Sequence, residues 1–171
     1  GRVRYIGVTQ WNREYYDTME RLVRTADLDF IQVNYSIFSR HCEERLLPAC
    51  VDNGVAVQIN MPFEKARLFT CVAGRPVPDF AREFGAETWA QFFLKFILSH
   101  PAVTVVIPAT SNPDHLTDNM GALYGELPDK KMRERMVKYM EEIPGFADTL
   151  KQPPYPGKNY GGVVTWPFRS A

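Results

Sequence analysis

The amino-acid sequence predicts an α/β fold of parallel β/α units with four strands, an extra C-terminal helix and an extended, proline-rich tail. Two observations lead to this prediction. Strand-like segments alternate four times with segments whose apolar residues recur at helical spacing, and short loops join most of them. The third and fourth strand-like segments are almost wholly apolar, which is typical of strands that are covered on both faces.

The first two units occupy the N-terminal third of the chain. Strands are expected over residues 3–9 and 29–35, where β-branched and aromatic residues are frequent. A helix over residues 43–52 is expected to end at Asn53-Gly54, because glycine readily ends a helix in the left-handed conformation. The apolar positions at helical spacing are Tyr16, Met19, Leu22 and Val23 in the first unit and Leu46, Leu47 and Cys50 in the second.

The third and fourth units follow. A strand over residues 55–60 is expected to end at Met61-Pro62, and a connection marked by proline and glycine leads to a helix over residues 88–99. The fourth strand is expected over residues 103–107, with a helix from about residue 113 to residue 123 behind it.

A charged helix over residues 129–142 is expected after the fourth unit. Its apolar stripe favours packing over ligand binding, and it consists of Met132, Met136, Tyr139 and Met140. From residue 143 onward, prolines alternate with glycines and aromatic residues, which favours an extended tail that drapes over the domain or reaches a neighbour. We therefore divide the chain into residues 1–127, 128–142 and 143–171.

Composition excludes several functional classes. Lys plus Arg and Asp plus Glu both number 20, so there is no basic field to attract nucleic acid or an anionic membrane. No apolar run is long enough for a membrane span, and no leader sequence precedes Gly1, which indicates a soluble protein. Three cysteines without a CxxC pair are expected to be reduced and mostly packed, and no metal site is expected.

The loops after the four strands carry mainly amide and hydroxyl side chains. In a parallel barrel such loops lie at the end where ligands bind. Amides and hydroxyls bind a carboxamide, a ribose or a phosphate, but they are poor general acids or bases at neutral pH, so the pattern indicates binding more than catalysis. The residues are Thr9, Gln10, Gln32, Asn34, Tyr35, Asn60, Lys65, Thr110, Ser111 and Asn112.

The fourth loop is the most informative part of this set. It runs into a helix whose N-terminus would point free backbone N–H groups toward the strand ends, a place that suits phosphate. His115, in the first turn of this helix, either contacts such an anion or is a solvated surface residue.

Other charged and nucleophilic residues are interpreted as structural. His41 beside Cys42 lacks an orienting third group, so a Cys/His nucleophile is not expected. His100, at a helix-to-strand turn, is expected to be structural. The cluster of Arg40 with residues 43–45 is interpreted as a solvated helix start with local ion pairs.

On these segments the chain resembles the C-terminal half of the aldo-keto reductases. The resemblance covers roughly residues 1–127 and is carried by residues 1–11 (GRVRYIGVTQW), 29–36 (DFIQVNYS), 43–48 and 101–119. Asn60-Met-Pro-Phe63 is also similar to a bacterial branch whose members often look exported, so periplasmic localisation is the alternative to cytoplasmic.

The resemblance implies about half of a TIM-type (β/α)8 barrel that holds NADP(H) and reduces a carbonyl. Thr9 and Gln10 match a Ser-Asn pair that contacts the nicotinamide carboxamide, and Gln32 matches a third contact to the same group. Asn60 stands where many members have a tyrosine that stacks on the nicotinamide.

The same resemblance assigns the adenosine end of the cofactor. Thr110 matches a hydroxyl near the adenosine phosphate, and His115 matches the arginine that grips this phosphate. Asp118 and Asn119 match the adenine contacts. The change from arginine to His115, with Ala109 where lysine is frequent, makes NAD(H) the alternative cofactor.

The family's catalytic tetrad of Asp, Tyr, Lys and His lies on the first four strands, so no residue of this chain is assigned to it. One hypothesis is therefore an NADP(H)-dependent reductase of a small carbonyl substrate that needs the tetrad from elsewhere, through self-association or a partner chain closing the barrel. A second is a catalytically inactive half-barrel that binds a nucleotide or a protein partner, and a third is a structural fragment that binds nothing.

Overall fold

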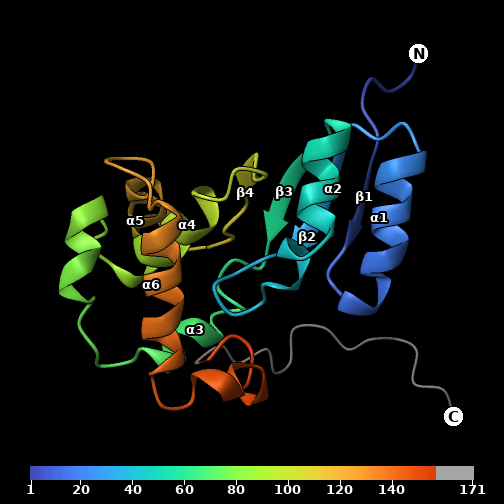
Figure 1. The fold of residues 1–171 in the computed structure, drawn as a ribbon. Helices are drawn as coiled ribbons and strands as arrows, with labels where there is room; N and C mark the ends of the chain where they lie inside the picture. Colours follow the sequence, from blue (N-terminus) through green and yellow to red (C-terminus); the bar gives the residue numbers. More distant parts are fainter. Residues whose placement is uncertain (157–171) are drawn as a thin grey trace, which may run out of the picture.

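The computed structural model describes residues 1–156 of the chain, and Figure 1 shows their arrangement. One parallel sheet has the strand order β1-β2-β3-β4, which confirms the predicted α/β fold of four parallel strands. The strands are β1 (Gly7–Gln10), β2 (Phe30–Asn34), β3 (Ala56–Asn60) and β4 (Val105–Val106). The two outer strands are shorter than the sequence predicted, since each has a neighbouring strand on one side only.

The two faces of the sheet have different surroundings. Ile31, Val57 and Ile59 point to the helix-covered face and are completely buried. The opposite face carries the row Thr9, Gln32, Gln58 and Val105, joined by the strand register, and Val105 is 44% exposed. The prediction that the third and fourth strands are covered on both faces was therefore wrong for the fourth strand. On the third strand, Ala56, Gln58 and Asn60 of this face are half-buried. We call this second side, on which no helix of the described residues 1–156 covers Val105, the open face.

The helices that follow β1 and β2 lie side by side against the sheet (Figure 1). They are α1 (Tyr16–Thr25) and α2 (Leu46–Asn53), with a 3₁₀ helix (His41–Glu43) before the second. Helix α2 starts later than predicted, because residues 43–45 form the end of the 3₁₀ turn and its continuation. Its end at Gly54, with φ of 67°, confirms the predicted glycine stop.

The connection from β3 to the next long helix contains two short elements that the sequence did not reveal. These are α3 (Arg67–Cys71) and a 3₁₀ helix (Asp79–Phe84). Helix α4 (Trp89–Leu98) follows, and the Thr88 hydroxyl caps it by accepting a hydrogen bond from the Gln91 N–H group. Helix α4 lies within one residue of its predicted bounds, because an N-cap threonine is a local signal.

Two further long helices follow α4. Helix α5 (Pro113–Gly121) starts with proline at its first position, and α6 (Lys130–Glu141) starts after Asp129, whose carboxylate accepts from the Met132 N–H group. Met136 and Met140 are completely buried, which confirms that the stripe of α6 serves packing.

The segment after α6 differs from the extended tail that the sequence predicted. Residues Phe146–Lys151 form a 3₁₀ helix, and Phe146 and Thr149 are buried. The Phe146 ring packs edge-on against Phe38, with centroids 5.3 Å apart. The prediction of an extended tail was wrong for these residues, because they pack onto the existing core and need no core of their own. The rest of the predicted tail, residues 157–171, lies outside the described residues.

One buried cation fixes the turn after α5. Lys95 in α4 is fully buried, and its ammonium donates hydrogen bonds to the carbonyls of Tyr124 and Glu126. Burial lowers the pKa of Lys95, and the charge of Glu126 partly offsets this effect. Within the described part of the chain, no helix is long and apolar enough to cross a membrane.

Candidate functional site

A cavity of about 650 Å³ lies beyond the carboxyl ends of β3 and β4. Four parts of the chain form its walls: the β3–α3 loop, the start of α4, the β4–α5 loop with the first turns of α5, and Tyr155-Pro156. Ligands of parallel α/β folds bind at this end of the strands. The lining is mainly apolar with a few polar groups, as in sites for small organic ligands.

The β4–α5 wall carries most of the polar groups. Thr110, His115, Asp118 and Asn119 all line the cavity. Asn119 is only 7% exposed, and it lines the cavity from α5. An amide at a cavity wall is available to a ligand as donor and as acceptor.

Asp118 has a different role from its neighbour. Its carboxylate accepts hydrogen bonds of 2.8 Å from the Thr88 hydroxyl and from the Gln91 side-chain amide. These bonds tie α5 to the start of α4. Asp118 therefore holds two walls of the cavity together.

The β3–α3 wall has an unusual backbone. Met61, Glu64, Lys65 and Ala66 all have φ between 48° and 68°, a region that non-glycine residues rarely adopt. Glu64 is 2% exposed and accepts a 2.6 Å hydrogen bond from the Ser36 hydroxyl, which anchors the loop. Such backbone strain persists only where surrounding contacts hold it.

A ladder of neutral side chains occupies the open face of the sheet. Gln32 Oε1 accepts from the Thr9 hydroxyl and from Asn60 Nδ2, both at 3.2 Å, and Gln32 Nε2 donates to Gln58 Oε1 at 3.1 Å. Asn60 Oδ1 is buried without a hydrogen-bond partner among the described residues. The ladder therefore leaves one buried acceptor unused at the carboxyl end of β3.

The structure divides the predicted binding residues into three groups. Lys65, Thr110, His115, Asp118 and Asn119 line the cavity. Thr9, Gln32 and Asn60 belong to the ladder, while the Gln10 side chain closes a local turn by accepting from the N–H groups of Trp11 and Asn12. Ser111 and Asn112 line neither, and Asn112 instead caps α5.

Some residues of the site were missed by the sequence analysis. Gln58 joins the ladder, and its position two residues before Asn60 on one strand was the signal, since alternate strand residues share a face. Phe63, Trp89 and Tyr155 line the cavity, and no local pattern distinguishes them from core aromatic residues.

The Cys42 thiol is 1% exposed, and its sulfur lies 3.8 Å from the Asn34 carbonyl oxygen. Burial, with a smaller contribution from Glu43, raises the pKa of Cys42, so the thiol stays protonated. The neighbouring His41 ring instead lies 3.1 Å from the Arg13 guanidinium. The two side chains do not form a nucleophile–base pair.

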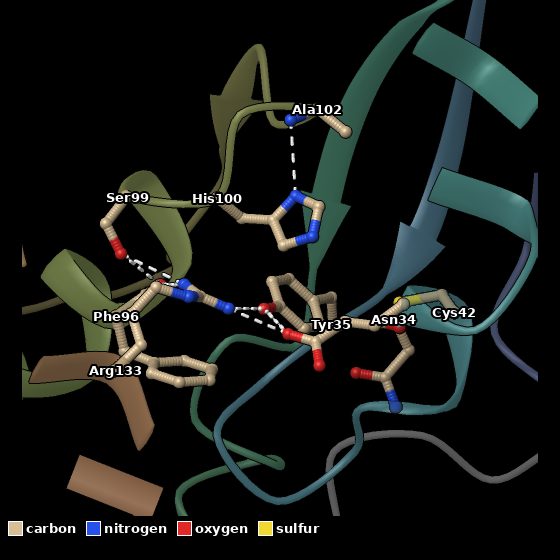
Figure 2. Close-up of polar contacts among 9 residues, drawn as sticks. Asn34, Tyr35, Cys42, Phe96, Ser99, His100, Ala102 and Arg133 are labelled. Carbon is tan, nitrogen blue, oxygen red and sulfur yellow. Dashed lines mark hydrogen bonds and ion pairs between the residues drawn. The ribbon is translucent and has the colours of Figure 1, made fainter. Parts of the chain in front are cut away.

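The charged cluster near residue 43 corrects one interpretation. Its ion pairs are mostly long-range: Arg133 with Glu43 at 2.7 Å, Arg40 with Glu141 at 2.8 Å, and Arg45 with Glu20 at 2.7 Å. The proximity of these residues in the sequence suggested local pairs, but their partners lie on other helices. Figure 2 shows Arg133 between the end of α4 and the Tyr35 hydroxyl.

His100 packs beside this network. Its ring meets Tyr35 edge-on with centroids 5.7 Å apart, and its Nδ1 atom accepts from the Ala102 N–H group (Figure 2). Burial and the nearby Arg133 lower the pKa of His100, while Glu43 partly opposes them. His100 therefore has structural contacts, as the sequence predicted.

Comparisons with known proteins place these features in context. The family model described as the aldo/keto reductase family matches residues 1–137. The NADH-specific methylglyoxal reductase of Escherichia coli (strain K12) is 35% identical over 91 residues, which are 53% of this chain and 26% of that protein. A probable aldo-keto reductase 1 of Glycine max is 24% identical over 161 residues, covering 78% of this chain and 45% of that protein.

Solved structures with a similar fold include an aldo/keto reductase from Klebsiella pneumoniae in complex with NADP and acetate. It has a TM-score of 0.62 and 28% identity, over 81% of this chain and 49% of that one. The holo form of aldo-keto reductase AKR11C1 from Bacillus halodurans has a TM-score of 0.60 and 21% identity, over 79% of this chain and 49% of that one. The chain thus spans about half the length of these solved structures and less than half the length of the curated relatives.

Proposed function

The chain belongs to the aldo/keto reductase family, and we propose that it forms the cofactor-binding half of an NADP(H)-dependent carbonyl reductase. The observation that carries this proposal is the cavity of about 650 Å³ at the carboxyl ends of β3 and β4, next to the N-terminus of α5. The adenosine-phosphate end of the cofactor fits this place, because helix N-termini and cationic side chains favour phosphate.

Two side chains of the cavity supply positive charge or donors for the phosphate groups. Lys65 lines the cavity from the β3–α3 loop and His115 from the first turn of α5. Thr110 adds a hydroxyl, and the buried amide of Asn119 offers a donor and an acceptor to the adenine. Asp118 holds this wall in place through its hydrogen bonds with Thr88 and Gln91. We propose no direct contact between Asp118 and the adenine.

The nicotinamide end is proposed to lie on the ladder of the open face. The unused Asn60 Oδ1 atom would accept a hydrogen bond from the carboxamide N–H of the nicotinamide. Thr9 and Gln32 would orient the same group, after exchanging their mutual hydrogen bond for a bond to it. When bound, the cofactor supplies the hydride, and these residues of the chain only hold and orient it.

The relatives differ in the cofactor that their names give. The Escherichia coli relative is called NADH-specific, whereas the Klebsiella structures hold NADP or NADPH. We propose NADP(H) for this chain, with NAD(H) as the alternative. Histidine lacks the planar guanidinium fork of the arginine that the resemblance implies at this position, so His115 is expected to weaken the preference for the 2′-phosphate.

Carbonyl reduction also requires groups that this chain is not proposed to supply. The open face and the unpaired edges of β1 and β4 present strand backbone and apolar residues to a partner, including Phe30, Val105 and Ile107. We propose that a second copy or a partner chain covers this face and closes the barrel, and that the tetrad and a small carbonyl substrate belong to the closed form.

Sedimentation velocity at micromolar concentration tests the closure. Concentration-dependent association that Val105→Asp weakens supports it, and a monomer with an unchanged, cooperatively folded structure contradicts self-pairing. The same exposed face favours the second candidate function, an inactive half-barrel that binds a nucleotide or a protein.

NADPH titration combined with a turnover assay separates the two functions. Saturable binding with carbonyl reduction that Gln32→Leu abolishes supports the reductase. Binding without reduction, in every assembly state, supports the inactive module. The matched control is Thr18→Val, an exposed residue of α1 remote from the ladder.

A further inference from the structure

Residues 149–156 lie on the segment that forms the β3–α3 wall of the cavity, although the family match ends at residue 137. Three contacts attach them. The Thr149 hydroxyl lies 3.4 Å from Cys71 Sγ, Arg67 Nε donates to the Gln152 carbonyl at 2.6 Å, and the Tyr155 N–H donates to the Lys65 carbonyl at 2.8 Å.

This attachment reaches the strained part of the loop. Lys65 and Ala66 have φ of 56° and 68°, and Tyr155 itself has φ of 52°. The Tyr155 N–H group bonds the Lys65 carbonyl, so the C-terminal segment helps to fix the peptide that positions the Lys65 side chain. Thr149 is fully buried at the other end of the segment, which makes the attachment continuous with the core.

Tyr155 and Pro156 also line the cavity, together with Lys65, Ala66 and Phe69 on the same side. The polar wall of His115 and Asn119 belongs to α5. A tyrosine ring in such a cavity offers a flat apolar face to a planar base. Tyr155 is 41% exposed, so part of its surface is accessible.

We propose that Tyr155 is a ligand-positioning residue which this chain adds to the family pocket, packing its ring against the adenosine end of the nucleotide. The segment from Gln152 to Pro156 acts as a strap that holds the Lys65 loop in its binding conformation. This inference rests on the proposed function, since it assigns a specific wall of the same cavity to the adenosine.

The test measures dissociation constants of NADPH and of 2′,5′-ADP, which carries only the adenosine end, by calorimetry on the full chain. Tyr155→Ala is expected to weaken both ligands by the same factor, roughly five- to tenfold, because it removes the stacking of a partly exposed ring on the base. Tyr155→Phe keeps the ring and should retain the affinity. Arg67→Met, which cuts the strap outside the cavity, should weaken both ligands by a smaller factor.

Tyr5→Ala is the matched control, since Tyr5 is exposed and precedes β1 at the amino end of the sheet. Unchanged affinity of Tyr155→Ala for 2′,5′-ADP overturns the inference, as does equal weakening by Tyr155→Phe and Tyr155→Ala. If the unmodified chain binds neither ligand, the proposed function fails instead. Melting temperatures of all variants are measured in parallel. If Arg67→Met weakens binding while its melting temperature stays near that of the unmodified chain, the loss of affinity is a strap effect. A fall in its melting temperature that matches its loss of affinity contradicts the strap.

Discussion

The guanidinium of Arg133 and the carboxylate of Glu43 lie 2.7 Å apart, although 90 residues separate them in the sequence. Their side chains are 14% and 31% exposed. Arg133 also donates to the Tyr35 hydroxyl at 2.6 Å and to Ser99 Oγ at 2.9 Å, and its guanidinium lies 4.2 Å from the centre of the Phe96 ring. One side chain of α6 thus connects the β2–α2 loop with the end of α4.

Replacing Arg133 with methionine should therefore destabilise the fold. We expect Arg133→Met to lower the free energy of unfolding by about 2–3 kcal/mol, because it leaves Glu43 and Tyr35 without their partly buried partner. Urea denaturation measures this value. Arg40→Met is the matched control: the Arg40–Glu141 pair joins the same loop to α6, but its side chains are 33% and 53% exposed. The control should cost at most about 0.5 kcal/mol, and equal losses would contradict a special role for Arg133.

Acidification should destabilise the protein through His100. Burial and Arg133 lower the pKa of His100 in the folded protein below the ordinary value of 6.5. The unfolded chain therefore binds the proton first, so the stability that neutral His100 contributes is complete above about pH 6.5 and declines as the pH falls toward the folded pKa. Unfolding free energies at about pH 5 and pH 7.5 should differ more for the unmodified chain than for His100→Gln. Identical pH dependence in both proteins would refute this assignment.

The three thiols should react in a fixed order. Cys42 and Cys50 are buried, and burial raises the pKa of Cys42 and raises that of Cys50 to about 11, whereas Cys71 is half-buried. Iodoacetamide under native conditions should therefore alkylate Cys71 alone, as read by mass spectrometry of peptides. All three should react in urea. Native labelling of Cys42 before Cys71 would show that the packing around the β2–α2 loop is wrong.

Restoring arginine at position 115 should shift the cofactor preference. His115→Arg is expected to tighten NADPH binding roughly tenfold, since a fixed guanidinium pairs with the 2′-phosphate, and to change NADH binding by less than about twofold. Fluorescence titration with both cofactors measures the ratio. His115→Gln is the neutral control, and it should not tighten NADPH. An equal gain for both cofactors would place residue 115 away from the 2′-phosphate.

The sequence predicted those features that depend on local signals. Thr88 and Asp129 cap helices close to the predicted starts, and Gly54 ends α2 as expected. The strand-end rule also placed Lys65 and His115 at one cavity. These predictions needed only composition, spacing and chain direction.

Other features depend on contacts between distant residues, and no local signal reported them. An apolar strand does not reveal whether one or both of its faces are covered, so the exposure of Val105 was missed. The left-handed residues of the β3–α3 loop include no glycine, the residue by which sequence usually marks such a conformation. The strap contact joins Tyr155 to Lys65, 90 residues earlier in the chain, and Tyr155 lies beyond the family match, which ends at residue 137.

Calorimetric titration of the full chain with NADPH tests the central claim most directly, with 2′,5′-ADP as competitor. We predict one saturable site of micromolar affinity from which 2′,5′-ADP displaces NADPH, and at least tenfold weaker binding when Asn119→Leu removes the amide of the cavity wall. Absence of saturable binding up to about 1 mM NADPH, or binding that Asn119→Leu leaves unchanged, would contradict it.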